Sequence, residues 1–142
     1  MSTARSLAAA VRLAGRFFVI GGTGKFGESL STVERFTPIA DVEVGADGVT
    51  TGGNWQTMAS LLTARRKPAA AVLRGVILVA GENSAEAFCA PVNPNGLGQW
   101  TAVRLAQAPR ADIFLLSLDS GFLEFCESLR IPSGGVVVIY LN

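Results

Sequence analysis

The sequence predicts an all-β fold built from repeated units, each a sheet of four short antiparallel strands. Three observations lead to this prediction: two stretches sixty positions apart match without gaps, glycines interrupt apolar runs of strand length, and a tryptophan recurs late in each unit. Self-similarity at a fixed spacing indicates a repeat architecture, in which one unit cannot bury both of its faces alone. Neighbouring units must therefore stack on one another.

The first half of each unit has the pattern of a β-hairpin. In both copies an arginine is followed by an apolar run, a glycine, and a second apolar run that stops at another glycine. Gly15 and Gly75 stand where the hairpins turn, and Gly21 and Gly81 stand where they end, as expected of residues that tolerate a positive φ. The matching ranges are 8–15 with 68–75, and 17–22 with 77–82.

The second half of each unit predicts two more strands. Residues 33–38 alternate in character along a strand that includes Glu34, and residues 85–91 repeat this pattern. After a turn-rich loop, Trp55 and Trp100 each stand at the start of the last segment of their unit. The predicted unit is therefore a sheet of four strands.

These repeats divide the chain into three parts. Residues 4–62 form the first repeat, with a long glycine-rich loop at 39–54 that we expect to be an insertion between strands. Residues 63–107 form the second repeat. Residues 108–142 hold a degraded third copy, which begins near Arg110, and a C-terminal strand that fits no position in the repeat.

The repeated residues resemble the Kelch repeat family. In that pattern an arginine precedes an apolar hairpin that ends in Gly-Gly, a Val-Glu-x-aromatic-x-Pro strand follows, and a tryptophan precedes the next arginine. Phe18–Gly22, Val33–Pro38 and Trp55 of this sequence match it closely. The signature positions of the repeat are Gly15, Gly21, Gly22, Glu34, Trp55, Arg65, Gly75, Gly81, Trp100 and Arg110.

The Kelch resemblance implies a β-propeller, in which four-stranded blades surround a central channel. Propellers close with about 4 to 8 blades. The three incomplete repeats of this chain therefore predict Kelch-type blades of four antiparallel strands in an incomplete, open propeller. In such a fold we expect Trp55 and Trp100 to pack between blades. We expect the glycines to allow positive φ angles or close approach between strands.

The resemblance also implies a function in protein recognition. The run from Trp55 to Arg65 is especially similar to the BTB–Kelch proteins, which capture a substrate for a cullin-type ubiquitin ligase. A cullin would be reached only through a domain that is expected to lie outside this sequence. Other Kelch relatives bind actin, and the sequence does not separate these two partners.

The composition argues against catalysis and against several classes of ligand. The chain has no histidine and only two cysteines, which excludes histidine-dependent catalytic triads and the common zinc sites. Its formal net charge of +1 favours neither nucleic acid nor an anionic membrane as a partner. We therefore expect no enzyme activity, no cofactor and no metal. The few cysteines fit a cytoplasmic protein.

One motif supports a different function. Gly22, Gly24 and Gly27 form a G-x-G-x-x-G sequence directly after a predicted strand, as in Rossmann-like oxidoreductases that bind NAD(P). This alternative predicts a helix over residues 25–36, whose first amides would hold the pyrophosphate. Against it, residues 81–84 stand at the same place in the second copy without this motif, and a phosphate-binding turn has no reason to recur as a plain loop.

Two basic stretches have further interpretations. Arg65 and Arg66 precede the second repeat in a loop that a propeller places at its rim, and we expect them to contact a protein partner. Residues 1–16 contain three arginines and no acid, a composition that also resembles a mitochondrial transit peptide. The repeat gives those residues another role, as part of the first hairpin.

Overall fold

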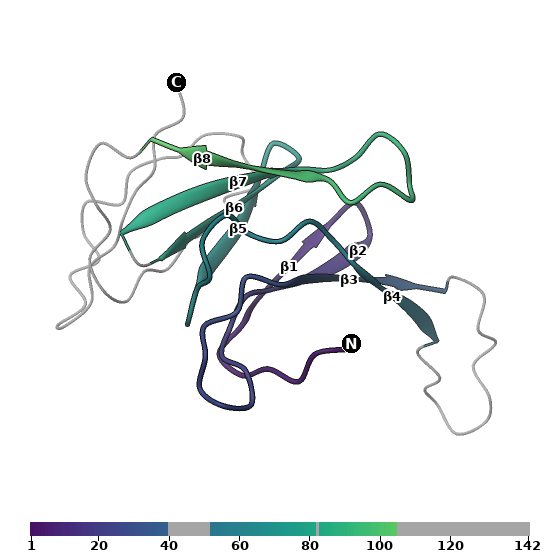
Figure 1. Cartoon of the computed structure of the whole chain (residues 1–142). Coiled ribbons are helices and arrows are strands. Elements are labelled where there is room, and N and C mark those ends of the chain that lie inside the picture. The colour runs from purple at the N-terminus through teal and green to yellow at the C-terminus, as the bar shows by residue number, and fades with distance from the viewer. Residues whose placement is uncertain (40–51, 82, 105–142) are drawn as a thin grey trace, which may run out of the picture.

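The computed structural model describes residues 1–39, 52–81 and 83–104, which form eight strands in two antiparallel sheets (Figure 1). In each sheet the strands lie in chain order. The first sheet consists of β1 (Ala9–Leu13), β2 (Arg16–Ile20), β3 (Val33–Pro38) and β4 (Gly53–Thr57). The second sheet consists of β5 (Ala69–Leu73), β6 (Val76–Gly81), β7 (Ser84–Cys89) and β8 (Gln99–Val103).

The β1–β2 and β5–β6 turns have the same backbone conformation. Ala14 and Gly15 have φ angles of 48° and 75°, and Arg74 and Gly75 have φ angles of 48° and 78°. Two consecutive positive φ angles characterise the type I′ turn, whose twist matches that of the strands it joins. The predicted hairpins that turn at Gly15 and Gly75 are confirmed.

Each sheet has two faces, because side chains alternate across a strand. We call face A the side of each sheet that carries its tryptophan, Trp55 or Trp100, and face B the opposite side. Phe18, Ile20 and Val33 lie on face B of the first sheet. The face A rows are Phe17, Phe36 and Trp55 in the first sheet, and Ile77, Phe88 and Trp100 in the second.

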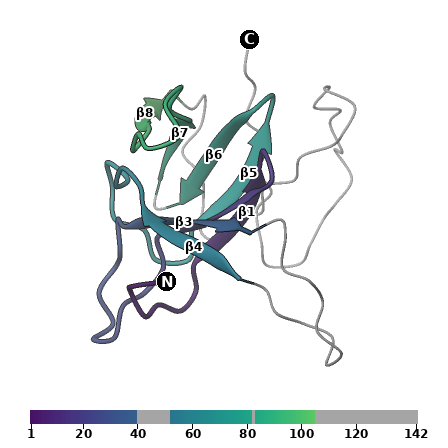
Figure 2. The same ribbon diagram turned by 90° about the vertical axis from the view of Figure 1, so that its right-hand side faces the viewer.

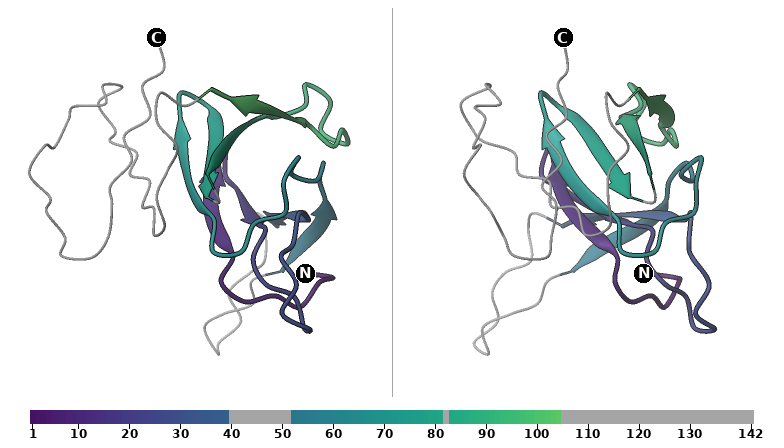
Figure 3. Two further views of the ribbon diagram at one scale, coloured as in Figure 1. Left: turned by 60° about the vertical axis from the view of Figure 1, so that its left-hand side comes forward. Right: turned by 90° about the vertical axis from the view of Figure 1, so that its left-hand side faces the viewer.

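Face B of the first sheet packs on face A of the second, and this contact forms the core. The rings of Phe18 and Phe88 have centroids 5.6 Å apart. Strands β1 and β5 lie side by side at this contact (Figure 2), and Figure 3 shows the two sheets from two other directions. Burial of this apolar surface is the main force that holds the sheets together. The buried cluster consists of Phe18, Ile20, Val33, Met58, Leu61, Ile77, Val79, Phe88 and Trp100.

The structure confirms the predicted all-β fold with two four-stranded antiparallel sheets of the blade type, and the described residues do not close into a ring. The predicted loop at 39–54 ends too late, because β4 already begins at Gly53 and pairs with β3 there. The predicted third repeat at 108–142, with Arg110, lies outside the described residues. Within the described ranges, no helix is long and apolar enough to cross a membrane.

Candidate protein interface

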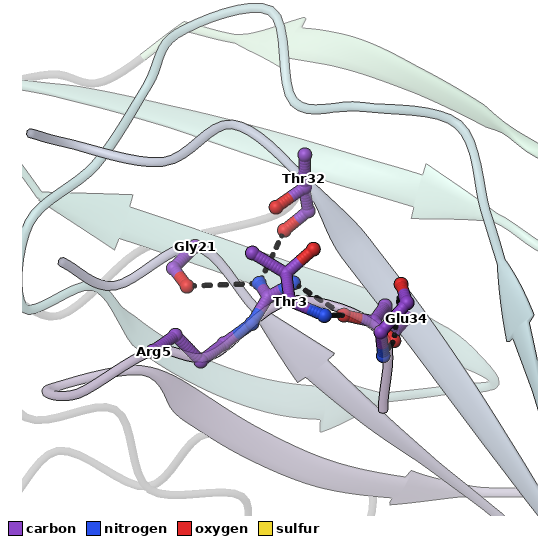
Figure 4. A network of polar contacts seen from close by, with 6 residues as sticks. Thr3, Arg5, Gly21, Thr32 and Glu34 are labelled. Carbon is purple, nitrogen blue, oxygen red and sulfur yellow. Dashed lines mark hydrogen bonds and ion pairs between the residues drawn. The ribbon is translucent and has the colours of Figure 1, made fainter. Parts of the chain in front are cut away.

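A buried arginine ties the N-terminal segment to the first sheet (Figure 4). The Arg5 guanidinium donates hydrogen bonds to the carbonyl oxygens of Gly21 and Thr32, at 3.0 and 2.8 Å, and pairs with Glu34 at 2.7 Å. The Glu34 carboxylate also accepts hydrogen bonds from two backbone amides upstream of Arg5. Both charges are therefore compensated, as a buried ion pair requires.

The second sheet repeats this arrangement around Arg65. Its guanidinium donates to the carbonyl oxygen of Gly81 and to the carbonyl and hydroxyl oxygens of Ser84, and it pairs with Glu86 at 2.8 Å. Glu86 also accepts two amide hydrogen bonds from the segment that precedes Arg65. The arginine, glycine and glutamate of each repeat thus anchor the segment that enters their own sheet.

The prediction that Arg65 contacts a partner is wrong, because its side chain is completely buried in this network. Arg66 is exposed, and its contact with a partner stays a prediction. Sequence reasoning did not assign roles to Arg5 and Glu86. The signal was present, because the alignment of the two copies places Arg5 opposite Arg65 and Glu34 opposite Glu86.

Glu34 has a pKa shifted by competing effects. Burial alone raises the pKa of Glu34, but hydrogen bonds from the Ser2 and Thr3 amides, together with the hydrogen bond and charge of Arg5, outweigh it and hold the pKa below its usual 4.5. A carboxyl group whose pKa is lower in the folded state stabilises the fold at pH values above its unfolded pKa. That stabilisation is lost as the pH falls through the folded pKa.

We therefore expect the free energy of unfolding to decrease as the pH drops below about 4.5. In Glu34→Gln, which cannot ionise at this position, the decrease over the same pH range is expected to be smaller. Urea denaturation at a series of acidic pH values measures both proteins. Parallel curves for the two would contradict the role given to the Glu34 carboxylate.

Gly22 connects the two sheets through its backbone. Its φ angle is 100°, and a Cβ atom here would lie 2.5 Å from the carbonyl oxygen of Ser6. Its amide donates a hydrogen bond of 2.9 Å to the carbonyl oxygen of Arg65, in the segment that enters the second sheet. Glycine is required here by both conformation and space, as predicted for the repeat glycines.

The NAD(P)-binding interpretation of Gly22, Gly24 and Gly27 is wrong. These glycines lie in the loop that joins the antiparallel strands β2 and β3, and β3 occupies part of the range predicted to be helical. The loop closes on itself, since the Gly24 amide donates to the carbonyl oxygen of Glu28 at 2.9 Å. Residues 21–39 contain no helix, so no helix N-terminus is available there to hold a pyrophosphate.

The two signature tryptophans have different environments. Trp100 is 4% exposed, and its Nε1 donates a hydrogen bond of 2.9 Å to the carbonyl oxygen of Ala59 at the end of the first sheet. Trp55 is 42% exposed and packs on the Phe36 ring, with centroids 5.1 Å apart. The prediction of packing between blades is confirmed for Trp100. For Trp55 it stays a prediction, because the described part of the chain holds no second sheet that could lie against face A of the first sheet.

The β2–β3 loop forms another exposed region. It lies at the end of the strands that is opposite to the type I′ turns. The loop between β2 and β3 exposes Phe26, with the Lys25 ammonium 5.8 Å from its ring centroid. Leu30 and Arg65 form a β-bridge, which brings this loop beside the segment that carries the exposed Arg66. An aromatic ring and cationic side chains therefore share this end of the molecule.

The described residues are strongly basic. They include ten arginine and lysine residues, but their only acids are Glu28, Glu34 and Glu86. Two of these acids are taken up by the buried pairs with Arg5 and Arg65. The described residues therefore carry an excess of positive charge, although the formal net charge of the whole chain is only +1.

Comparison with known proteins identifies one family motif. Residues 4–42 match the Kelch motif, a range that covers β1, β2 and β3 and includes Arg5, Gly22 and Glu34. No curated protein matches the chain. The chain therefore contains a Kelch motif, and its two four-stranded sheets are consistent with Kelch blades.

Proposed function

We propose that this chain recognises a protein partner through the loop end that exposes Phe26 and Arg66. The Kelch motif and the paired four-stranded sheets imply a β-propeller protein-binding module. The main support for this proposal is that the two sheets share the same buried scaffold but differ in the loop between their second and third strands. Both sheets share the arginine–glutamate network, but their β2–β3 and β6–β7 connections differ greatly in length.

The longer loop has the chemistry of a recognition element. It spans residues 21–32, whereas the equivalent connection in the second sheet spans only 82–83. Phe26 is 87% exposed at this loop, beside Lys25. Exposed aromatic and arginine side chains often dominate the energy of protein interfaces, and loops on a rigid scaffold commonly carry function.

We further propose that the partner is a substrate of a cullin-type ubiquitin ligase, which the chain would hold as the recognition part of a BTB–Kelch adaptor. The similarity of the Trp55–Arg65 run to those proteins supports this assignment. Actin is the second candidate, because other Kelch proteins bind it. In either case the role is binding without catalysis, in the cytoplasm, and without a cofactor.

Affinity capture from the native cells followed by mass spectrometry tests the proposal. We expect a protein partner that is captured together with a cullin, and we expect Phe26→Ala to reduce its recovery several-fold. Ile39→Ala is the matched control, because Ile39 is also exposed but follows β3 at the other end of the sheet. Actin without a cullin would support the second candidate. The proposal would be overturned if neither a cullin nor actin were captured and if Phe26→Ala left the recovery of the captured proteins unchanged.

A further inference from the structure

We call the contact between face B of the first sheet and face A of the second sheet the seam. Two arginines, Arg16 and Arg35, lie at one end of this seam. Arg16 and Arg35 both lie on face B of the first sheet, since they alternate in step with Phe18 and Ile20 in the strand register. They are at the end of the seam that carries the type I′ turns. This end is opposite to the loop that exposes Phe26.

Arg35 is buried, but it contacts only neutral groups among the described residues. Its Nη2 donates hydrogen bonds to Gln56 Oε1 and to the carbonyl oxygen of Pro94, the latter at 3.0 Å. The residue is 5% exposed, and its Nε is buried without an acceptor. Buried cations are usually paired with a carboxylate, because an uncompensated charge is costly to remove from water. Among the described residues, Arg35 thus has no carboxylate partner of the kind that Arg5 and Arg65 have.

The described part of the chain offers no carboxylate to this end of the seam. Glu34 and Glu86 are engaged by Arg5 and Arg65. Glu28 lies in the β2–β3 loop at the opposite end, where its carboxylate accepts a hydrogen bond from a backbone amide of the same loop. The positive charge at this end is therefore not neutralised by these three acids.

Arg16 adds a second positive charge beside Arg35. Loss of hydration lowers the pKa of Arg35, and repulsion from Arg16 lowers it further. Arg16 is only half-buried, so its guanidinium remains accessible to solvent. A single anion that reached Arg16 would relieve the repulsion within the pair.

The fold does not require this pair, since the second sheet has neither arginine. In the strand registers, Arg16 corresponds to Val76 and Arg35 corresponds to Ala87. The buried networks of Arg5 and Arg65 are shared by both sheets, and the Arg16–Arg35 pair is an addition to that scaffold. Arg35 also joins the two sheets through Pro94, but the second positive charge, that of Arg16, makes no such structural contact among the described residues, which favours a binding role for the pair.

We propose that Arg16 and Arg35 form a carboxylate-binding site that receives an acidic side chain of a protein partner. This inference rests on the proposed protein-binding function and adds a chemical class to the partner. The loop that supplies the carbonyl oxygen of Pro94 also exposes Val92 and Leu97. The partner segment that fits therefore carries an acidic residue next to apolar ones. Arg16 binds the carboxylate directly, and Arg35 supplies the second charge.

Fluorescence polarisation with the full chain tests the site. The probes are fluorescein-labelled hexaglutamate and its neutral counterpart hexaglutamine, at low ionic strength where surface charges are least screened. We expect hexaglutamate to bind and hexaglutamine not to bind. Arg16→Gln is expected to weaken hexaglutamate binding about tenfold, as for the loss of a charge-assisted hydrogen bond, and Arg16→Lys to weaken it less.

Arg12→Gln is the matched control. It removes the same charge from the same hairpin, but Arg12 lies on face A with its guanidinium 5.9 Å from the centroid of the Phe17 ring. Equal losses in Arg12→Gln and Arg16→Gln would overturn the site, because they would show a general charge effect. Tighter binding of a single-stranded RNA oligonucleotide than of hexaglutamate would overturn the choice of a protein partner. Neither result would change the outcome of the affinity-capture experiment with Phe26→Ala. The carboxylate-binding site and the proposed protein-binding function can therefore be disproved independently.

Discussion

Replacing Arg65 with alanine is expected to lower the free energy of unfolding by about 3–5 kcal/mol, as for the loss of one partner from a buried ion pair. The substitution leaves the buried Glu86 side chain without its cationic partner, and it removes the donor for the carbonyl oxygens of Gly81 and Ser84. Guanidinium denaturation followed by tryptophan fluorescence measures the change. The large loss of stability arises because one member of a buried ion pair is left without its partner. It does not require that the intact pair contribute much net stability.

Arg66→Ala is the control for this prediction. It removes the same side chain one position later, where the residue is exposed. Contacts of exposed charges contribute about 1 kcal/mol or less, so a small change is expected. Equal destabilisation by Arg65→Ala and Arg66→Ala would contradict the buried network.

Replacing Phe88 with alanine is expected to destabilise the chain by about 3–5 kcal/mol, as for a fully buried phenylalanine. Phe88 is 0% exposed and touches both Phe18 of the first sheet and Trp100 of its own sheet. The cavity would therefore open at the centre of the contact between the sheets. Urea denaturation gives the change in the free energy of unfolding.

Phe36→Ala provides the matched comparison, since Phe36 has the same position in the first sheet. Phe36 is only half-buried, because face A of its sheet has no sheet above it in the described part. We expect a loss of about 1–2 kcal/mol, in proportion to the smaller apolar area that is buried. A loss as large as that of Phe88→Ala would show that the two faces are equally covered.

The repeat in the sequence was sufficient to predict the fold class and the hairpins. Two copies that align without gaps identify equivalent residues, so the alignment alone places the turns at Gly15 and Gly75 and the strands around them. The same comparison argued correctly against a phosphate-binding loop at Gly22. Local turn chemistry and strand periodicity carry these predictions, and both are properties of a short stretch of chain.

Burial was predicted less well, because it depends on which neighbour covers each face. Trp55 and Trp100 are equivalent in sequence, but within the described residues Trp100 is buried against the first sheet and Trp55 is exposed. Arg65 stands in a run of three basic residues, which is typical of an exposed loop, and only the fold brings it to Glu86, 21 positions away. In the sequence, Arg35 is one residue of the alternating strand at 33–38. Only the three-dimensional contacts show that its hydrogen bonds within the described residues go to neutral groups.

The stacking of face B of the first sheet on face A of the second is the central claim, and nuclear Overhauser contacts between aromatic protons test it most directly. We predict cross-peaks between Phe18 and Phe88, whose ring centroids are 5.6 Å apart and which come from different sheets. Cross-peaks within each sheet, Phe36 with Trp55 and Phe88 with Trp100, serve as the internal reference. A spectrum with both reference cross-peaks but none between Phe18 and Phe88 would contradict the stacking.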